Sequence, residues 1–174
     1  MGTGIIVCGL NGVGKSTLGK ALAIKLNFHF IDNEDLYFPK TDLNYMYAVS
    51  RTQDKVERLL YDEIREHENF VFSAVTGKYG EAAAKYFDYA ILLSVPKDIR
   101  MQRVKDRSFK KFGDRMLPGG DLYDREQGFF ELVRSRDENM TEDWLRSFDG
   151  TVIRIDGTKP VEENIDFIIE RLQL

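Results

Sequence analysis

The chain has 174 residues, of which 43% are hydrophobic and 31% are charged. This is enough for one domain with a substantial hydrophobic core, so we expect residues 1–174 to form a single domain. The net charge of −4 argues against a general nucleic-acid-binding surface. No stretch approaches the roughly 18 apolar residues of a membrane helix, and the single cysteine excludes an internal disulfide. We therefore expect a cytoplasmic protein without a membrane partner, as a monomer or homodimer.

The most specific motif follows the first apolar run of the chain. Residues 9–16 read G-L-N-G-V-G-K-S, which matches the phosphate-binding pattern G-x-x-x-x-G-K-[ST]. Residues 4–8 before it have strand character, and Lys15 to Leu26 after it carries apolar residues at helical spacing. Because glycine has no Cβ, such a loop can wrap closely around a polyphosphate at the start of a helix. The sequence therefore predicts a site for a nucleoside triphosphate.

Each polar residue of this loop has an expected role. Lys15 is expected to reach the β and γ phosphates, and the Ser16 hydroxyl is expected to coordinate Mg²⁺. Thr17 is expected to lie beside the α phosphate. The expected nucleotide-binding residues are Gly9, Asn11, Gly12, Val13, Gly14, Lys15, Ser16 and Thr17.

Strand-like and helical segments alternate along the whole chain. Strand-like runs are predicted at 5–8, 28–31, 70–75, 89–95 and 151–155. Helical patterns are predicted at 15–26, 53–67, 97–107, about 125–146 and 161–172. This alternation is typical of an α/β fold with a parallel sheet covered by helices, which binds ligands at the carboxyl ends of its strands.

Acidic residues follow the second predicted strand. Asp32 stands at its end, and Glu34 follows two residues later. Such carboxylates could hold Mg²⁺ through water, orient an acceptor hydroxyl or take its proton. The alternative is that Asn33, Glu34 and Asp35 cap the next helix and solvate a turn. We favour a functional role for Asp32, as a catalytic, substrate-binding and metal-binding residue.

The third predicted strand ends without an acidic pair. Many ATPases that drive motion carry an Asp, often followed by Glu, at this position. Here the strand holds Ser73 and is followed by Thr76-Gly77-Lys78. A dedicated hydrolase is therefore disfavoured, and Asp32 becomes the main candidate for the carboxylate near the metal.

Basic charge is concentrated in one segment. Residues 100–115 contain seven basic and two acidic residues, a net +5, which leaves −9 for the rest of the chain. Gly113 and the Pro118-Gly119-Gly120 run suggest a mobile flap that closes over phosphates and excludes water. We expect Arg107 and Arg115 at the ends of the flap to contact phosphate, whereas a solvated helix face is the alternative.

The region between residues 36 and 58 is aromatic and basic. Tyrosines with Arg51 would suit an acceptor that carries a nucleobase and an anionic group, although tyrosines that pack a small subregion are the alternative. Arg51 and then Arg136 are the candidates for an anionic acceptor. His29 and His67 have no spacing typical of a metal site or a nucleophile, and we expect them to be satisfied or exposed.

Several segments together resemble the small P-loop kinases, a group that includes shikimate, gluconate and nucleoside monophosphate kinases such as adenylate kinase. The resemblance extends from the phosphate loop nearly to the end of the chain. It is carried by residues 9–17, 30–34, 73–77, 92–96, 103–107 and 155–160, the last of which resembles the turn that lines the adenine.

The resemblance implies a three-layer α/β/α P-loop fold with a five-stranded parallel sheet and a mobile lid at about residues 107–124. It also implies an acceptor-binding region at about 34–60 and the use of Mg-ATP. Asp32 and Glu34 match the pair of aspartates of shikimate kinases, with Glu in the second place, and Arg136 lies near their late substrate-binding arginine. The glycine triplet of those enzymes is absent after the third strand, where Thr76-Gly77-Lys78 stands, which weakens shikimate as the acceptor.

The sequence thus predicts a kinase that transfers the γ-phosphoryl group of Mg-ATP to a small acceptor such as a nucleotide, hydroxy acid or sugar acid. Lys15, Asp32, Arg107 and Arg115 are the expected catalytic residues. One alternative is an ATP-responsive switch protein that phosphorylates no acceptor. Another is a kinase of polynucleotide ends, which the acidic remainder of the chain disfavours.

Overall fold

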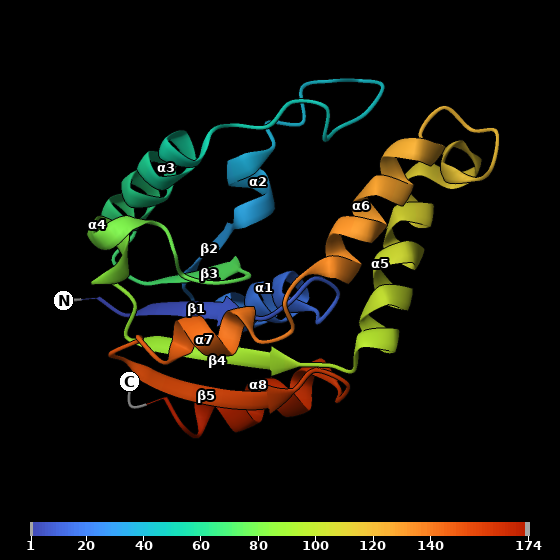
Figure 1. The fold of residues 1–174 in the computed structure, drawn as a ribbon. Helices are drawn as coiled ribbons and strands as arrows, with labels where there is room; N and C mark the ends of the chain where they lie inside the picture. The colour runs from blue at the N-terminus through green and yellow to red at the C-terminus, as the bar shows by residue number, and fades with distance from the viewer. Residues whose placement is uncertain (1, 173–174) are drawn as a thin grey trace.

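The protein is an α/β domain built on a five-stranded parallel sheet (Figure 1). A computed structural model describes residues 2–172. The strands lie in the order β2-β3-β1-β4-β5. Their bounds are β1 (Gly4–Cys8), β2 (His29–Asp32), β3 (Phe70–Ala74), β4 (Tyr89–Ser94) and β5 (Thr151–Asp156). The expected fold class is therefore confirmed.

Helices connect the strands and cover both faces of the sheet. Those before β4 are α1 (Lys15–Leu26), α2 (Asn33–Tyr37), α3 (Gln53–Glu66) and α4 (Gly80–Ala84). Those after it are α5 (Lys97–Phe112), the 3-10 turn η1 (Gly113–Met116), α6 (Tyr123–Ser135), α7 (Met140–Leu145) and α8 (Val161–Ile169). The short helices α2 and α4 were not predicted as segments of their own, because each has only five residues.

The sheet buries apolar side chains on both faces, as expected when helices cover it from two sides. On one face, strand residues such as Ile6 and Phe72 pack with Leu60 of α3 and Trp144 of α7. On the other, residues such as Val7 pack with side chains of α1 and α8. Successive residues of a strand point to opposite faces, so one strand contributes to both cores. The result is a three-layer α/β/α arrangement.

The parallel register brings the ends of the strands to one edge. Asp32 of β2 is aligned with Ser73 of β3, and Cys8 of β1 is aligned with Ala74 of β3 and Leu92 of β4. The phosphate loop, the residues after β2 and the start of α5 therefore meet at the same edge of the sheet (Figure 1).

Beyond this edge, α5 and α6 form a helical hairpin (Figure 1). Val104 of α5 and Met116 of η1 are buried together with Phe130 and Val133 of α6, so the hairpin has a small core of its own. The residues expected to form the flap, 107–124, comprise the end of α5, η1 and the start of α6 in this hairpin. Helix α5 continues to Phe112, and the glycine-rich stretch forms a packed tip closed by backbone hydrogen bonds such as Leu122 N–H to Arg115 O (2.9 Å).

The single helix expected at about 125–146 is wrong, since the chain forms α6 and α7 there with a break between them. Arg136 ends α6 in an extended conformation, with ψ of 139°. The Asp137 side chain then accepts a hydrogen bond from the Asn139 N–H (2.9 Å), which closes a tight turn. The break lets α6 join the hairpin while α7 packs on the sheet. Among residues 2–172, no helix is both long and apolar enough to span a bilayer.

Truncation of the central core should destabilise the whole domain. Phe72 is fully buried between β1 and β2, so we expect Phe72→Ala to lower the free energy of unfolding by about 3–5 kcal/mol. Chemical denaturation measures this change. Leu132→Ala on the outer side of α6, where the side chain is 54% exposed, is the control and should change stability by less than about 0.5 kcal/mol. Equal effects of both substitutions would contradict the assignment of the core.

Candidate functional site

The phosphate loop has a backbone that only glycine adopts easily. Gly9, Gly12 and Gly14 have φ of 140°, 86° and 98°. A Cβ on Gly9 would lie 2.6 Å from the Leu93 carbonyl oxygen, and one on Gly12 would lie 2.4 Å from the Arg100 carbonyl oxygen. Gly14 has open space around its Cα, so its requirement is conformational. Two of the glycines therefore allow close packing on β4 and α5, and the third sets the start of α1.

Two arginines at the base of α5 hold this loop. The Arg100 side chain is only 2% exposed and donates hydrogen bonds to the carbonyl oxygens of Val95 (3.2 Å) and Asn11 (3.3 Å). It also forms an ion pair with Glu138 (2.6 Å). Arg103 donates to the carbonyl oxygens of Val13 (3.4 Å) and Gly157 (3.2 Å). These bonds tie α5 to two carbonyls of the loop, those of Asn11 and Val13, and to the segments after β4 and β5.

Lys15 is the charged centre of the site. Its Nζ donates a hydrogen bond to the Leu10 carbonyl oxygen (3.0 Å) within the loop. Burial lowers the pKa of Lys15 from 10.5 to about 8, and the positive charges of Arg107 and Arg136 act in the same direction. The carboxylate of Asp32 opposes this shift. Charges from α5, from the end of α6 and from the end of β2 therefore all converge on the lysine of the phosphate loop.

Oxygen atoms lie next to this lysine at the ends of β2 and β3. The Ser16 Oγ is 3.4 Å from the Ser73 Oγ. Asp32 caps α2, where its Oδ1 accepts a hydrogen bond from the Glu34 N–H (3.0 Å). Oδ2 of Asp32 makes no hydrogen bond within residues 2–172. The cap of α2 is thus Asp32 rather than Asn33, Glu34 or Asp35, for which capping was the alternative, and it leaves one Asp32 carboxylate oxygen without a hydrogen bond among residues 2–172.

Glu34 is more strongly engaged than Asp32. Its Oε1 accepts a hydrogen bond from the Tyr47 hydroxyl (3.0 Å) and forms ion pairs with Lys40 (3.3 Å) and Lys111 (3.5 Å). Burial acts to raise the pKa of Glu34, but Lys111, Tyr47 and Lys40 outweigh it and hold the pKa below its usual value. A carboxylate with several donors and a lowered pKa is a weak proton acceptor.

The loop between α2 and α3 contacts the helical hairpin. The Tyr45 hydroxyl donates to Oε1 of Glu126 on α6 (2.8 Å), and the Tyr45 ring lies 5.3 Å from the ring of Phe112 at the end of α5. The Tyr47 hydroxyl bonds to Lys111. Glu126 is 1% exposed, and its Oε2 has no hydrogen-bond partner among residues 2–172. These tyrosines therefore pack against the hairpin of α5 and α6 rather than only within residues 36–58.

The expected arginines lie in different places. Arg107 and Arg136 lie close enough to Lys15 to influence its pKa, and neither forms a hydrogen bond or ion pair within residues 2–172. Arg51 donates to the carbonyl oxygens of Leu36 (2.7 Å) and Asp35 (3.0 Å). Arg115 is paired with Asp121 (2.6 Å) at the tip of the hairpin. Of the four arginines expected at the site, only Arg107 and Arg136 thus lie near Lys15.

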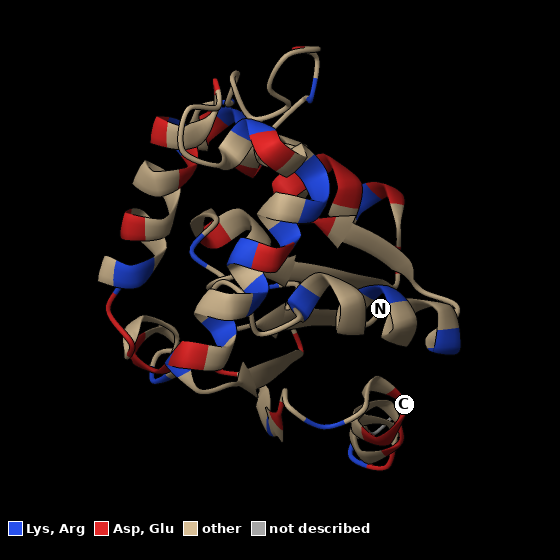
Figure 2. Cartoon of the chain, turned by 90° about the vertical axis from the view of Figure 1, so that its right-hand side faces the viewer, with Lys and Arg blue, Asp and Glu red and all other residues tan. Residues whose placement is uncertain are grey.

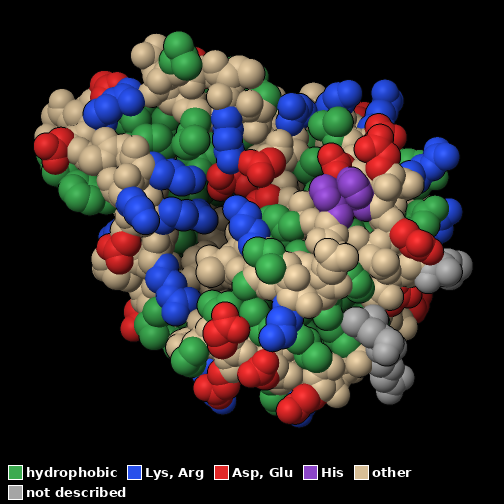
Figure 3. Space-filling model, turned by 180° about the vertical axis from the view of Figure 1, so that it is seen from behind, with side chains coloured by type: hydrophobic (Ala, Val, Ile, Leu, Met, Phe, Trp, Pro, Cys, Tyr) green, Lys and Arg blue, Asp and Glu red, His purple; other side chains and the backbone are tan. Residues whose placement is uncertain are grey.

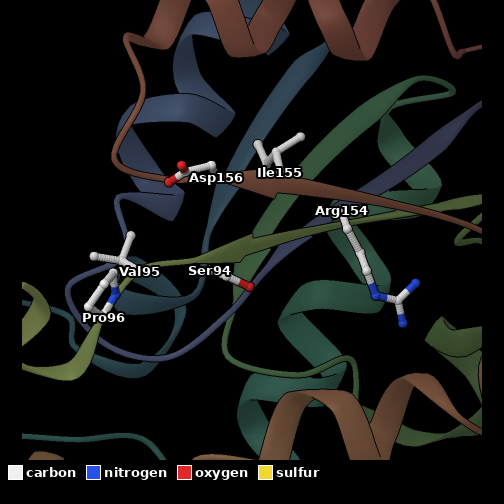
Figure 4. A pocket seen from close by; sticks show the side chains of 6 residues that line it. All are labelled: Ser94, Val95, Pro96, Arg154, Ile155 and Asp156. Carbon is white, nitrogen blue, oxygen red and sulfur yellow. The ribbon is translucent and has the colours of Figure 1, made fainter.

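Basic residues recur along α5 (Figure 2). On the face opposite to that of Figure 1, Lys and Arg side chains gather beside a hollow of the surface (Figure 3). A separate open pocket of about 590 Å³ lies at the ends of β4 and β5 (Figure 4). It is lined by Ser94, Val95, Pro96, Arg154, Ile155 and Asp156. This pocket includes the first residues of the turn expected to line the adenine, but it excludes Lys15 and Asp32.

Some residues of the site carried no clear signal in the sequence. In the sequence, Arg100 is one of the seven basic residues of segment 100–115 and has no distinguishing pattern. Only its burial in the structure indicates that it supports the phosphate loop. Glu126 reads as an ordinary helix residue. Cys8 is fully buried in β1, and this burial raises the pKa of its thiol to about 12.

His29 and His67 lie together, which their spacing did not indicate, and the expectation that His29 is satisfied is confirmed by its contact with Glu63. Their rings are stacked with centroids 3.5 Å apart, and Nε2 of His29 lies 2.8 Å from Oε2 of Glu63. Their proximity could have been predicted only from the pairing of β2 with β3, which the sequence did not indicate.

The fold and the phosphate loop define a P-loop nucleotide-binding protein. The model of the AAA domain family matches residues 5–115, and the chain belongs to this family. Across 97% of this chain and 96% of its own length, the YqaC protein of Bacillus subtilis (strain 168), described as uncharacterized, is 28% identical to this chain. A cytidylate kinase of Haloarcula marismortui is 29% identical over 62% of this chain and 60% of its own length.

Solved structures share the fold at lower identity. A deoxyadenosine kinase from M. mycoides has a TM-score of 0.58 and 18% identity, with 97% of this chain and 98% of that chain covered. A shikimate kinase from Bacteroides thetaiotaomicron has a TM-score of 0.55 and 20% identity, with 99% of each chain covered. The expected resemblance to small P-loop kinases is therefore confirmed at the level of the fold.

Replacement of Lys15 should stabilise the protein in the absence of nucleotide. The pKa of Lys15 is lower in the folded than in the unfolded protein. The charged lysine therefore lowers the free energy of unfolding below pH 8, and this destabilisation is lost as the pH rises toward 10.5. We expect Lys15→Met to raise the free energy of unfolding at pH 7 by about 1–3 kcal/mol. Denaturation at several pH values measures this difference between variant and wild type. A difference that stays constant from pH 7 to 10.5, or has the opposite sign, would contradict the buried ammonium.

Proposed function

We propose that the protein is an ATP-dependent kinase that transfers the γ-phosphoryl group to a hydroxyl of a small, anionic acceptor. The observation that carries this proposal is the convergence of Asp32, Arg107 and Arg136 on Lys15. A nucleotide-binding loop alone would support binding only. A carboxylate and two arginines near the phosphate lysine supply what phosphoryl transfer needs.

In this reaction the acceptor oxygen forms a bond to the γ phosphorus as the bond between that phosphorus and ADP breaks. Lys15 and the N–H groups of the loop hold the β and γ phosphates. Arg107 and Arg136 balance the negative charge on the transferring group. The proton of the acceptor hydroxyl passes to a carboxylate at the end of β2.

Asp32 is the better candidate for this carboxylate. One of its oxygens makes no hydrogen bond within the described residues, whereas Glu34 is held by Tyr47, Lys40 and Lys111. A lowered pKa further weakens Glu34 as a base. We therefore assign to Glu34 the positioning of the acceptor and of the loop that carries Tyr47.

The residues near the loop also suit Mg²⁺. The Ser16 hydroxyl and, through water, the Asp32 carboxylate would hold the ion, since both offer the hard oxygen atoms that Mg²⁺ prefers. Bound Mg²⁺ would supply charge neutralisation of the β and γ phosphates.

Further assignments concern the region around the acceptor and the lid. We propose that residues 34–60 bind the acceptor and that the hairpin around residues 107–124 acts as the lid. Arg115 would act on phosphate only after it leaves Asp121, and Arg51 would act on the acceptor only after it leaves its carbonyl partners. Support for a small-molecule acceptor comes from the similarity to the cytidylate kinase and from the shared fold of the deoxyadenosine and shikimate kinases.

An acceptor screen tests the proposal. ADP formation from Mg-ATP should be slow alone and strongly stimulated by one class in a panel of nucleosides, nucleotides, hydroxy acids and sugar acids. Lys15→Met should abolish this stimulation, and Asp32→Asn should lower kcat by at least about a hundredfold. Glu34→Gln should raise KM more than it lowers kcat. A flat response across the panel would favour an ATP-responsive switch.

The two arginines beside Lys15 can be tested separately from folding. We expect Arg107→Met and Arg136→Met each to lower kcat/KM by about tenfold to a thousandfold. Each substitution removes a positive charge that stabilises the transition state more than it stabilises the bound substrates. Steady-state kinetics with the acceptor found in the screen measure the loss. Arg146→Met on α7, where the side chain is 80% exposed, is the matched control and should leave the kinetics unchanged. Unchanged kinetics in all three variants would remove the arginines from the mechanism.

A further inference from the structure

Three side chains far from the phosphate loop form a second polar cluster, which consists of His29, Glu63 and His67. One ligand atom of each lies within 4.8 Å of those of the other two. The side chains are between 34% and 40% exposed, so solvent and ions can reach them. The two histidines lie together on the surface with acidic side chains beside them (Figure 3).

The fold brings these residues together in two ways. Glu63 and His67 are four residues apart at the end of α3, so they share one face of the helix. The chain then enters β3 at Phe70, which pairs with His29 at the start of β2. The turn between α3 and β3 is short, and His67 therefore comes to lie directly over His29.

The backbones that carry these side chains are fixed. The N–H of His29 donates to the Asn69 carbonyl oxygen (3.0 Å), and the N–H of His67 donates to the Glu63 carbonyl oxygen (3.2 Å). The imidazole rings are already stacked at 15° to each other, and His29 is already hydrogen-bonded to Glu63. The three groups are therefore already close together before any ligand binds.

We propose that His29, Glu63 and His67 form a binding site for a divalent transition-metal ion, and specifically for Zn²⁺. Zinc bonds to imidazole nitrogen and carboxylate oxygen are about 2.0–2.2 Å long, so tetrahedral ligands stand about 3.4 Å apart. The two rings must turn out of their stacked arrangement for both nitrogens to face one ion, and rotations about the side-chain bonds can bring ligand atoms that lie within 4.8 Å to this separation. Water completes the coordination.

The donor set decides which ion the cluster takes. Two imidazoles and one carboxylate suit Zn²⁺, whereas Mg²⁺ and Ca²⁺ prefer oxygen ligands only. The cluster is also separate from the proposed Mg²⁺ ligands, because His29 begins β2 and Asp32 ends it. The single cysteine is fully buried and cannot offer a competing thiolate.

Bound Zn²⁺ would fasten the end of α3 to the start of β2. The ion would bind the folded chain and lose its site on unfolding, so it would stabilise the domain in proportion to its concentration. The start of α3 follows the loop that carries Tyr45 and Tyr47, and the clamp therefore anchors the helix behind that loop.

Calorimetric titration of Zn²⁺ into the full chain, without nucleotide and without a polyhistidine tag, tests the site. We expect one equivalent to bind and the melting temperature to rise with Zn²⁺. His29→Asn, His67→Asn and Glu63→Gln should each weaken binding by about tenfold or more, and the double variant His29→Asn/His67→Asn should lose it. Co²⁺ in place of Zn²⁺ should give visible absorption bands in the wild type that the double variant lacks.

Glu66→Gln is the matched control, because Glu66 is an exposed carboxylate next to His67 on α3 and outside the cluster. This variant should bind Zn²⁺ as the wild type does. Circular dichroism verifies that the variants are folded. The proposal is overturned if the wild type binds no Zn²⁺, or if the double variant binds it as tightly as the wild type. Neither result bears on the proposed kinase activity, which the acceptor screen measures with Mg²⁺ alone.

Discussion

The close packing of the phosphate loop on β4 and α5 is the constraint on which the rest of the structure depends. Without side chains at Gly9 and Gly12, the loop can approach the carbonyl oxygens of Leu93 and Arg100. The side chain of Arg100 then bonds back to the loop at Asn11. The loop and the base of α5 are thus joined both by close backbone packing and by a side-chain hydrogen bond.

This junction explains how charge is organised at the site. Two carbonyls of the loop are occupied by Arg100 and Arg103, so those arginines are structural. Arg107 lies one turn further along α5 than Arg103 and is not bound to the loop, yet it influences Lys15. Helix α5 therefore carries two kinds of arginine. Arg100 and Arg103, near the loop, hold its backbone, whereas Arg107, one turn further along, influences the charge of Lys15.

The contacts between the hairpin and the α2–α3 loop connect the two halves of the site. Glu34 lies between Asp32 at the end of β2 and Lys111 of the hairpin, while Tyr45 bonds to the buried Glu126. A movement of the hairpin must break or rearrange these contacts. The α2–α3 loop and the hairpin are therefore joined by short-range polar interactions that do not pass through the sheet.

The local patterns of the sequence predicted much of this architecture. The alternation of apolar runs and helical spacing predicted all five strands within about one residue and the start of α1 at Lys15, because both depend on local periodicity. The break between α6 and α7 was missed, because a helical pattern continues across it while the two helices pack on different parts of the molecule. The extension of α5 to Phe112 was also missed. The basic residues after Arg107 interrupt the spacing of apolar residues that indicates a helix.

For the site, the sequence by itself determined the phosphate loop and the acidic residue at the end of β2, because motif spacing and strand ends are local properties. Only the tertiary structure decided which of the many basic residues approach Lys15, and that Arg51 and Arg115 are held elsewhere. It alone brought His29 to His67, because the adjacency of β2 and β3 is set by the order of strands in the sheet. Strand order depends on which faces pack together across the whole chain, and no spacing along the sequence records it.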